Sequence, residues 1–99
     1  MILARYEKQP LEVKDYDVSY VPWLLAMSDT LSALTTSVVC LTTPTNTTLE
    51  VDSTTVTDDA VKVWISGGTD GEQYKVTLRV TTTGGRVDES ELIFRVRDR

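Results

Sequence analysis

The sequence contains no histidine and a single cysteine, Cys40, and both shortages exclude classes of function. Without histidine, the commonest acid–base group is absent, as is every Ser-His or Cys-His catalytic pair. One cysteine cannot form a disulfide within the chain, so we expect Cys40 to be a small buried apolar residue rather than a reactive thiol. These absences favour a protein that is not an enzyme.

Long apolar runs are also missing. The longest, from Val21 to Met27, covers seven residues and contains Pro22, whereas a membrane-spanning helix needs about twenty. Only four apolar residues precede Arg5, far fewer than the core of a signal peptide requires. We therefore expect no membrane segment, and synthesis in a reducing cytoplasm.

Positive charge is scarce, because fifteen acidic residues stand against ten basic ones and the net charge is −5. This charge repels the phosphates of nucleic acids and anionic lipid headgroups alike. Nucleic acid and membranes are therefore disfavoured as partners. Acidic residues in two expected turns, Asp58 with Asp59 and Asp70-Gly71-Glu72, could bind calcium. The spacing of an EF-hand is absent, so we expect plain turns at both places and neither a metal nor a cofactor.

The residues that are abundant are β-branched, with 16 threonines and 13 valines. Such side chains suit a pleated sheet and lose rotamer freedom in a helix, so an all-β protein is expected. Alternation of apolar and polar residues predicts strands near residues 15–20, 49–51, 61–65, 74–80 and 92–96. Residues 30–39 are ambiguous in phase but rich in β-forming residues, so we expect a strand there too. A loop is expected over 42–48, and residues 21–27 have room for one helical turn.

The stretch RVTTTGGRVDE, from Arg79 to Glu89, raises the choice between a phosphate-binding loop and a hairpin. A phosphate loop requires a following helix and Gly-x-x-x-x-Gly-Lys spacing, and neither is present. Gly84 and Gly85 instead suit a tight turn, since glycine reaches positive φ at no steric cost. We expect a register with Arg79 opposite Glu91, and with inward pairs at Val80 and Ser90, Leu78 and Leu92, and Val76 and Phe94.

Three aromatic residues have assignable places in such a fold. Tyr74 follows a glycine-rich crossing after Ile65, as does the tyrosine whose hydroxyl fixes the corner of a sandwich, so we expect a structural role. Trp23, after Pro22, is expected to close one end. Trp64 falls on the outward phase of its strand, where it either docks a partner or is covered by a terminal arm or loop of its own chain.

Three segments together resemble a known family: YEKQPLEVKDYDVSYVPWL near the start, SDTL at residues 28–31, and VWISGGTDGEQYKVTLRVTTTGGRVDE. They are similar to small bacteriophage virion proteins that serve as fibre-tail adaptors. The family's Lys-Asp-Pro corresponds to Lys8-Gln9-Pro10, without its acidic member. The resemblance implies an immunoglobulin/fibronectin III-like β-sandwich of about seven strands, present in several copies in a symmetric ring, which joins the phage tail to its fibres.

Under this hypothesis the chain divides into an N-terminal arm, residues 1–10, and an immunoglobulin-like β-sandwich domain, residues 11–99. The first nine residues show no partner strand within the chain, so we expect them to pair with a neighbouring subunit. The residues expected at partner interfaces are Ile2, Leu3, Tyr6, Trp64 and Ile93. Capsid decoration or a head–tail connector is the alternative, and a carbohydrate-binding module is a third.

Overall fold

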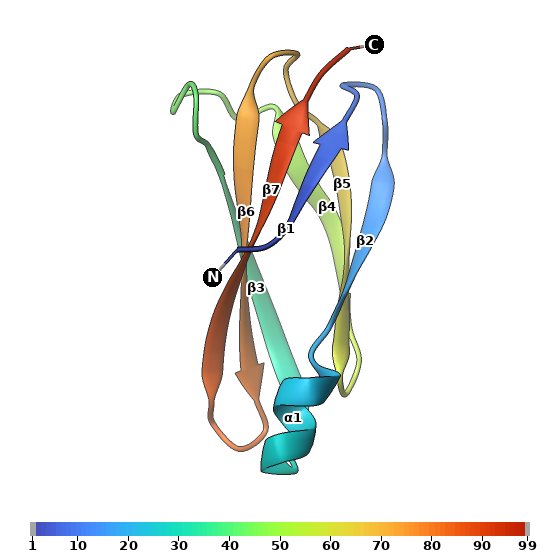
Figure 1. Cartoon of the computed structure of the whole chain (residues 1–99), viewed down its shortest axis with the longest axis vertical. Helices are drawn as coiled ribbons and strands as arrows, with labels where there is room; N and C mark the ends of the chain where they lie inside the picture. Colours follow the sequence, from blue (N-terminus) through green and yellow to red (C-terminus); the bar gives the residue numbers. More distant parts are fainter. Residues whose placement is uncertain (1, 99) are drawn as a thin grey trace.

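The computed structural model of the protein describes residues 2–98, which form two packed β-sheets and one short helix (Figure 1). The four-stranded sheet has the order β1-β7-β6-β3, and the three-stranded sheet the order β2-β5-β4. The predicted all-β sandwich of seven strands is therefore confirmed. In chain order the elements are β1 (Ile2–Lys8), β2 (Lys14–Ser19), α1 (Val21–Met27), β3 (Leu31–Cys40), β4 (Leu49–Val56), β5 (Ala60–Gly67), β6 (Gln73–Thr82) and β7 (Val87–Val96).

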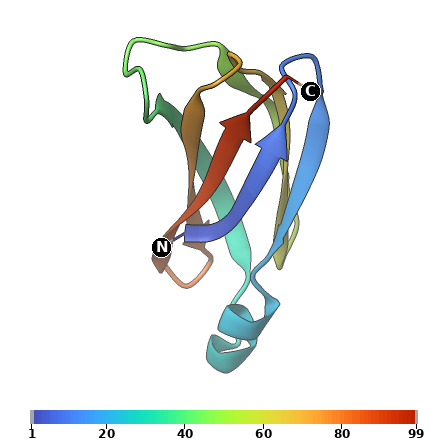
Figure 2. The same ribbon diagram turned by 45° about the horizontal axis from the view of Figure 1, so that its top comes forward.

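The strand order corresponds to that of immunoglobulin-like domains. Strands β2, β5 and β4 occupy the places of B, E and D, while β3, β6 and β7 occupy those of C, F and G. The first strand does not join β2. It lies beside β7 in parallel orientation, so that the first and last strands run side by side (Figure 2).

The core lies between the sheets and is built by residues that alternate along β5, β6 and β7. This alternation buries one side chain in two, as expected of strands with one face packed and one in water. Cys40 is buried at the edge of the same core, as predicted. The fully buried apolar side chains of these three strands are Val61, Val63, Ile65, Tyr74, Val76, Leu78, Val80, Leu92, Phe94 and Val96.

The prediction that the N-terminal residues lack a partner strand is wrong. β1 pairs with β7 in the same chain, from Ile2 opposite Glu91 to Lys8 opposite Val96. Tyr6 points inward, where its ring lies 5.3 Å from that of Phe94 and 4.5 Å from that of Tyr16. The pairing stabilises the fold because it covers an edge of β7 and completes an aromatic cluster.

The helix α1 closes one end of the sandwich (Figure 1). Pro22 suits its first turn, where an N–H has no partner in the helix. Leu24 is buried, and Trp23 packs against the core beside Tyr20, as expected of a residue that closes an end. The helix is longer than the single turn predicted, and Ser28 ends it in the left-handed conformation, with φ of 50°.

The hairpin between β6 and β7 exists as predicted, but the expected register is wrong by two residues. Val80 lies opposite Asp88 rather than Ser90, and Arg79 lies opposite Glu89 rather than Glu91. Glu91 instead forms an ion pair with Lys75 at 3.4 Å. The strands therefore extend further towards the turn, which takes only residues 83–86.

That turn is held by contacts with the segment after α1. The Asp29 carboxylate accepts hydrogen bonds from the Gly84 N–H at 3.0 Å and from the Arg86 guanidinium at 2.9 Å. Gly84 is required for this approach, since a Cβ there would lie 2.8 Å from Asp29 Oδ2. Gly85 has φ of 90°, in the region that favours glycine.

Candidate partner-binding surfaces

Trp64 lies on β5, the middle strand of the three-stranded sheet, and its side chain points away from the core, as the alternation predicts. Its neighbours Val63 and Ile65 are fully buried, whereas Trp64 is 39% exposed. β1 does not cover it, because that strand belongs to the other sheet. An exposed indole in the centre of a sheet face is a feature of surfaces that dock a partner.

Charged side chains surround this indole. Asp15 lies opposite Trp64 on β2, and Ser53 lies opposite it on β4. Lys62 lies two residues before Trp64 on β5 and therefore on the same face. Its ammonium pairs with Asp15 at 3.3 Å and with Asp17 at 3.9 Å. These pairs are exposed, so each contributes little to stability. Trp64 therefore has charged neighbours on β2 and β5, and protein–protein interfaces combine such polar groups with an apolar centre.

The other residues expected at interfaces do not join Trp64 in one surface. Ile2 and Leu3 are exposed at the start of β1, in the four-stranded sheet. Tyr6 is half-buried in the aromatic cluster. The expectation that Ile93 is exposed is wrong: it retains 5% exposure, between its cross-strand neighbours Arg5 and Lys75. Long side chains on both neighbouring strands account for this burial.

A second exposed apolar group was not expected from the sequence. Leu11 is 96% exposed in the turn between β1 and β2, and Val13 beside it is also exposed. Leu41, just after β3, is exposed as well. Figure 1 shows that these turns lie at the end of the sandwich opposite α1. The sequence feature that could have indicated this exposed group is an apolar residue, Leu11, directly after Pro10 in a short polar turn.

Tyr74 occupies the predicted corner position. Its ring is fully buried, and its hydroxyl donates to Asn46 Oδ1 at 2.9 Å and accepts from the Thr69 N–H at 2.9 Å. The Thr48 hydroxyl lies 3.0 Å from the same oxygen. These contacts join the β3–β4 loop to the β5–β6 loop, which gives Tyr74 a structural role rather than a place on an exposed surface.

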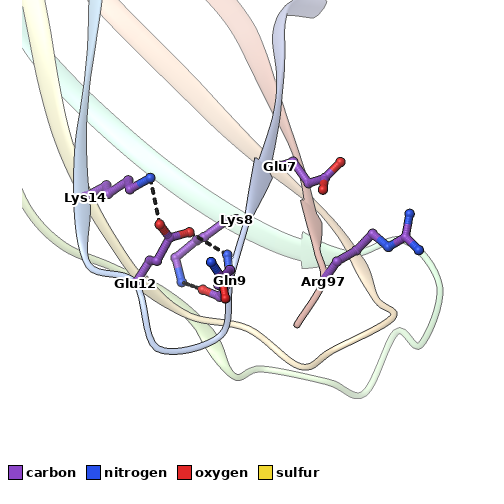
Figure 3. A pocket seen from close by; sticks show the side chains of 6 residues that line it. All are labelled: Glu7, Lys8, Gln9, Glu12, Lys14 and Arg97. Atoms are coloured by element: carbon purple, nitrogen blue, oxygen red, sulfur yellow. Dashed lines mark hydrogen bonds and ion pairs between the residues drawn. The ribbon is translucent and has the colours of Figure 1, made fainter. Parts of the chain in front are cut away.

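A polar pocket of about 200 Å³ lies beside the β1–β2 turn (Figure 3). Glu12 accepts a hydrogen bond from the Gln9 N–H at 2.7 Å and pairs with Lys14 at 2.7 Å, and these contacts hold its pKa below the ordinary value. Glu7 and Arg97 point away from this group (Figure 3). Its lining residues are Glu7, Lys8, Gln9, Glu12, Lys14 and Arg97.

Lys8 is the unusual residue of this pocket, because it is almost completely buried. Its ammonium donates to the carbonyl oxygens of Gly67 at 2.6 Å and Gln9 at 2.8 Å, with that of Pro10 at 3.5 Å. Burial lowers the pKa of the amine. With its donors engaged by backbone carbonyls, Lys8 serves to hold the fold together.

Among residues 2–98, no group of three or more His, Cys, Asp or Glu side chains is placed to hold a metal ion. Within the same range, no helix combines the length and the apolar character needed to cross a bilayer.

Comparison with known families agrees with the fold. No curated protein matches the chain. A family model described as "Podophage GP4 fiber-tail adaptor protein gp77" matches residues 8–95. The matched range includes Lys8, Trp64 and Tyr74, and it covers β2 to β7 except Val96, but only the last residue of β1. The resemblance found in the sequence is thereby confirmed, and the chain belongs to the podophage fibre-tail adaptor family gp77.

Proposed function

We propose that the chain is a non-enzymatic structural component of the virion that joins the phage tail to its fibres through direct protein–protein contacts. Membership of the fibre-tail adaptor family supports the adaptor role. The observation that carries the contact mechanism is Trp64, a large apolar side chain left 39% exposed in the middle of a sheet face. The net charge of −5 supports protein partners over nucleic acid or membranes.

The Trp64 surface, comprising Trp64, Lys62, Asp15, Asp17 and Ser53, has the anatomy of a small interface. The indole is the part whose burial would contribute most of the binding energy, since tryptophan is enriched among residues that dominate interfaces. The surrounding ion pairs would orient a partner of complementary charge. The chain would act in several copies, arranged as a symmetric ring in the virion tail and made in the cytoplasm of the bacterial host.

Replacing Trp64 tests this function. Virions assembled with Trp64→Ser are compared with wild-type virions for fibre content by quantitative mass spectrometry. Loss of a dominant interface residue costs about 2 kcal/mol or more, which weakens binding roughly 30-fold. We therefore expect the fibre content to fall. The control, Leu25→Ser, removes an exposed apolar side chain from α1 and should leave fibre content unchanged.

Two further measurements make the test decisive. Thermal unfolding of the isolated variants should match wild type, because Trp64 is outside the core. Mass spectrometry of separated heads and tails locates the chain. A full complement of fibres on Trp64→Ser virions would contradict the role of this surface, and recovery of the chain with heads alone would contradict the adaptor function.

A further inference from the structure

The outward face of the three-stranded sheet is predominantly acidic. Two carboxylates of β4 lie beside the Trp64 surface: Glu50 is opposite Ser66, two residues after Trp64, and Asp52 accepts a hydrogen bond from the Ser66 hydroxyl at 2.8 Å. With the two carboxylates of β2, four acidic groups and the Lys62 ammonium share this face with the indole. A molecule that covers Trp64 therefore meets negative charge around it.

The outward face of the four-stranded sheet has a pocket of about 340 Å³. Arg5 of β1 and Arg95 of β7 line it, and both side chains are exposed. Glu7 contributes a carboxylate, so positive groups outnumber negative ones among the lining residues. We call it the Arg5–Arg95 pocket, and it is lined by Arg5, Tyr6, Glu7, Gln73, Ile93 and Arg95.

Trp64 and the Arg5–Arg95 pocket lie on opposite sides of the sandwich. The chain neighbours of Trp64 and of Ile93 are all fully buried in the core between the two sheets. The side chains of Trp64 and Ile93 therefore point away from that core in opposite directions. A chain cannot bring its own indole to its own pocket, so a contact between the two requires a second copy.

The chemistry of the pocket suits an indole. A guanidinium stacks on an aromatic ring through its flat face, while its N–H edge can still donate to a carboxylate. An arginine that is engaged in an ion pair within its own chain thus keeps a face for the ring. The pocket volume is at the lower end of that of small-molecule sites, which suits one large side chain.

We propose that Trp64 of one copy of the chain enters the Arg5–Arg95 pocket of a second copy. Asp15 and Asp17 of the first copy would then face the guanidinium groups of the second, and this complementary charge would fix their orientation. Burial of the indole would supply most of the affinity. This inference rests on the proposed function, in which the Trp64 surface docks a protein, and it identifies that protein as another copy of the chain.

Such a contact joins two different surfaces of the same protein. Each copy therefore binds one neighbour through Trp64 and another through its pocket, and repetition of the contact gives a closed ring or an open filament. Fibres would be lost from Trp64→Ser virions because the adaptor itself fails to assemble.

Mixing two defective variants of the full chain tests the contact. Trp64→Ser lacks the indole but keeps the pocket, whereas Arg95→Glu keeps the indole but reverses a charge in the pocket. In sedimentation velocity, wild type should form oligomers as its concentration rises, and each variant alone should remain monomeric at concentrations at least tenfold higher. The equimolar mixture should form a dimer and nothing larger, because one productive pair of surfaces remains.

The control for the charge reversal is Arg79→Glu. Arg79 is an exposed arginine of β6, six residues after Gln73 and so about 20 Å along the strand from the pocket. This variant should form oligomers as wild type does, and melting temperatures check that all three variants are folded. Monomers alone in the equimolar mixture would overturn the proposal. Oligomers of Arg95→Glu alone would also overturn it, because the indole would then bind elsewhere.

Photo-crosslinking in assembled virions separates this inference from the adaptor function. The photoreactive residue p-benzoylphenylalanine is placed at Ser53, opposite Trp64 on β4. We expect crosslinks to β1 or β7 of the same protein, which must join two copies because these strands belong to the other sheet. Crosslinks exclusively to a different virion protein would overturn docking between copies and leave the adaptor function standing. Recovery of the chain with heads alone would remove the adaptor function.

Discussion

The Lys8 ammonium donates a hydrogen bond of 2.6 Å to the Gly67 carbonyl, which joins the last residue of β1 to the last residue of β5 in the opposite sheet. A buried ammonium loses its hydration and needs replacement acceptors. The carbonyls of Gln9 and Gly67 supply them. This end of the sandwich is therefore closed by a charged group, whereas the other end is closed by the apolar side of α1.

Replacing Lys8 should weaken the fold. Lys8→Met keeps an unbranched side chain but leaves the carbonyls of Gln9 and Gly67 without a donor. Hydrogen bonds to charged groups contribute about 1.5–3 kcal/mol, so we expect a loss in that range in urea denaturation. The matched control is Lys14→Met, an exposed lysine paired with Glu12, which should change stability by less than about 0.5 kcal/mol. Equal stabilities of the two variants would contradict the role given to Lys8.

A methyl group at Gly67 should be far more damaging than one at Gly71. Both glycines have positive φ, 76° and 86° respectively. A Cβ at Gly67 would lie 2.1 Å from the Thr48 carbonyl oxygen, whereas one at Gly71 has no atom within 4 Å. Gly71→Ala should therefore cost about 1 kcal/mol from backbone strain alone. Gly67→Ala adds the clash, and chemical denaturation should show a loss at least twofold larger.

Removing the Tyr74 hydroxyl should destabilise the two loops that it joins. In Tyr74→Phe, the Thr69 N–H and the Asn46 side chain lose a partner, which should cost about 1–2 kcal/mol. Tyr16→Phe serves as the control, because within residues 2–98 the Tyr16 ring packs with Tyr6 and Phe94 and its hydroxyl makes no hydrogen bond. Urea denaturation of both variants measures the difference. Equal losses would show that the hydroxyl contributes nothing at the corner.

Acid should weaken the fold through Asp29. Hydrogen bonds from the Thr82 hydroxyl, then from the Thr30 and Gly84 N–H groups and Arg86, lower the pKa of this carboxyl from 3.8 to about 2. The unfolded chain therefore binds the proton more readily, so stability falls as the pH drops from about 4 to about 2. Asp29→Asn should be less stable than wild type at pH 7, and the difference should shrink in that window.

Thermal unfolding from pH 7 to pH 2 measures this effect. Glu50→Gln, an exposed carboxyl on β4, should keep the wild-type profile. A constant gap between Asp29→Asn and wild type at all pH values would contradict the assignment to this carboxyl.

The strands with clear alternation, β2, β5, β6 and β7, were predictable because each buries one face. The register of the β6–β7 hairpin was not, since a shift of two residues keeps every side chain on the same face. The contacts that decide it come from elsewhere: Asp29 binds the turn, and Thr82 Oγ1 accepts from the Arg86 N–H at 2.9 Å. Hydrophobic pattern alone contains no information about these contacts.

The position of β1 in the sheet could also not be predicted from the sequence pattern. Its partner β7 lies at the far end of the chain, and local composition does not report such distant pairing. The sequence analysis placed Lys8 in an N-terminal arm without a partner strand, although Lys8 is on the inward phase shared with Ala4 and Tyr6. For the same reason, deleting the first nine residues would remove a strand from the chain's own sheet and would not report on contact with a neighbour.

The pairing of the first strand with the last has a consequence for how the protein is made. β1 precedes β7 by almost the whole described length of the chain, so β1 can join the sheet only after β7 has been made. Contacts between residues so distant in sequence form slowly, because closing the large loop between them costs conformational entropy before the contacts can stabilise the fold. We therefore expect the four-stranded sheet to be completed late in folding, after β7 has become available to pair with β1.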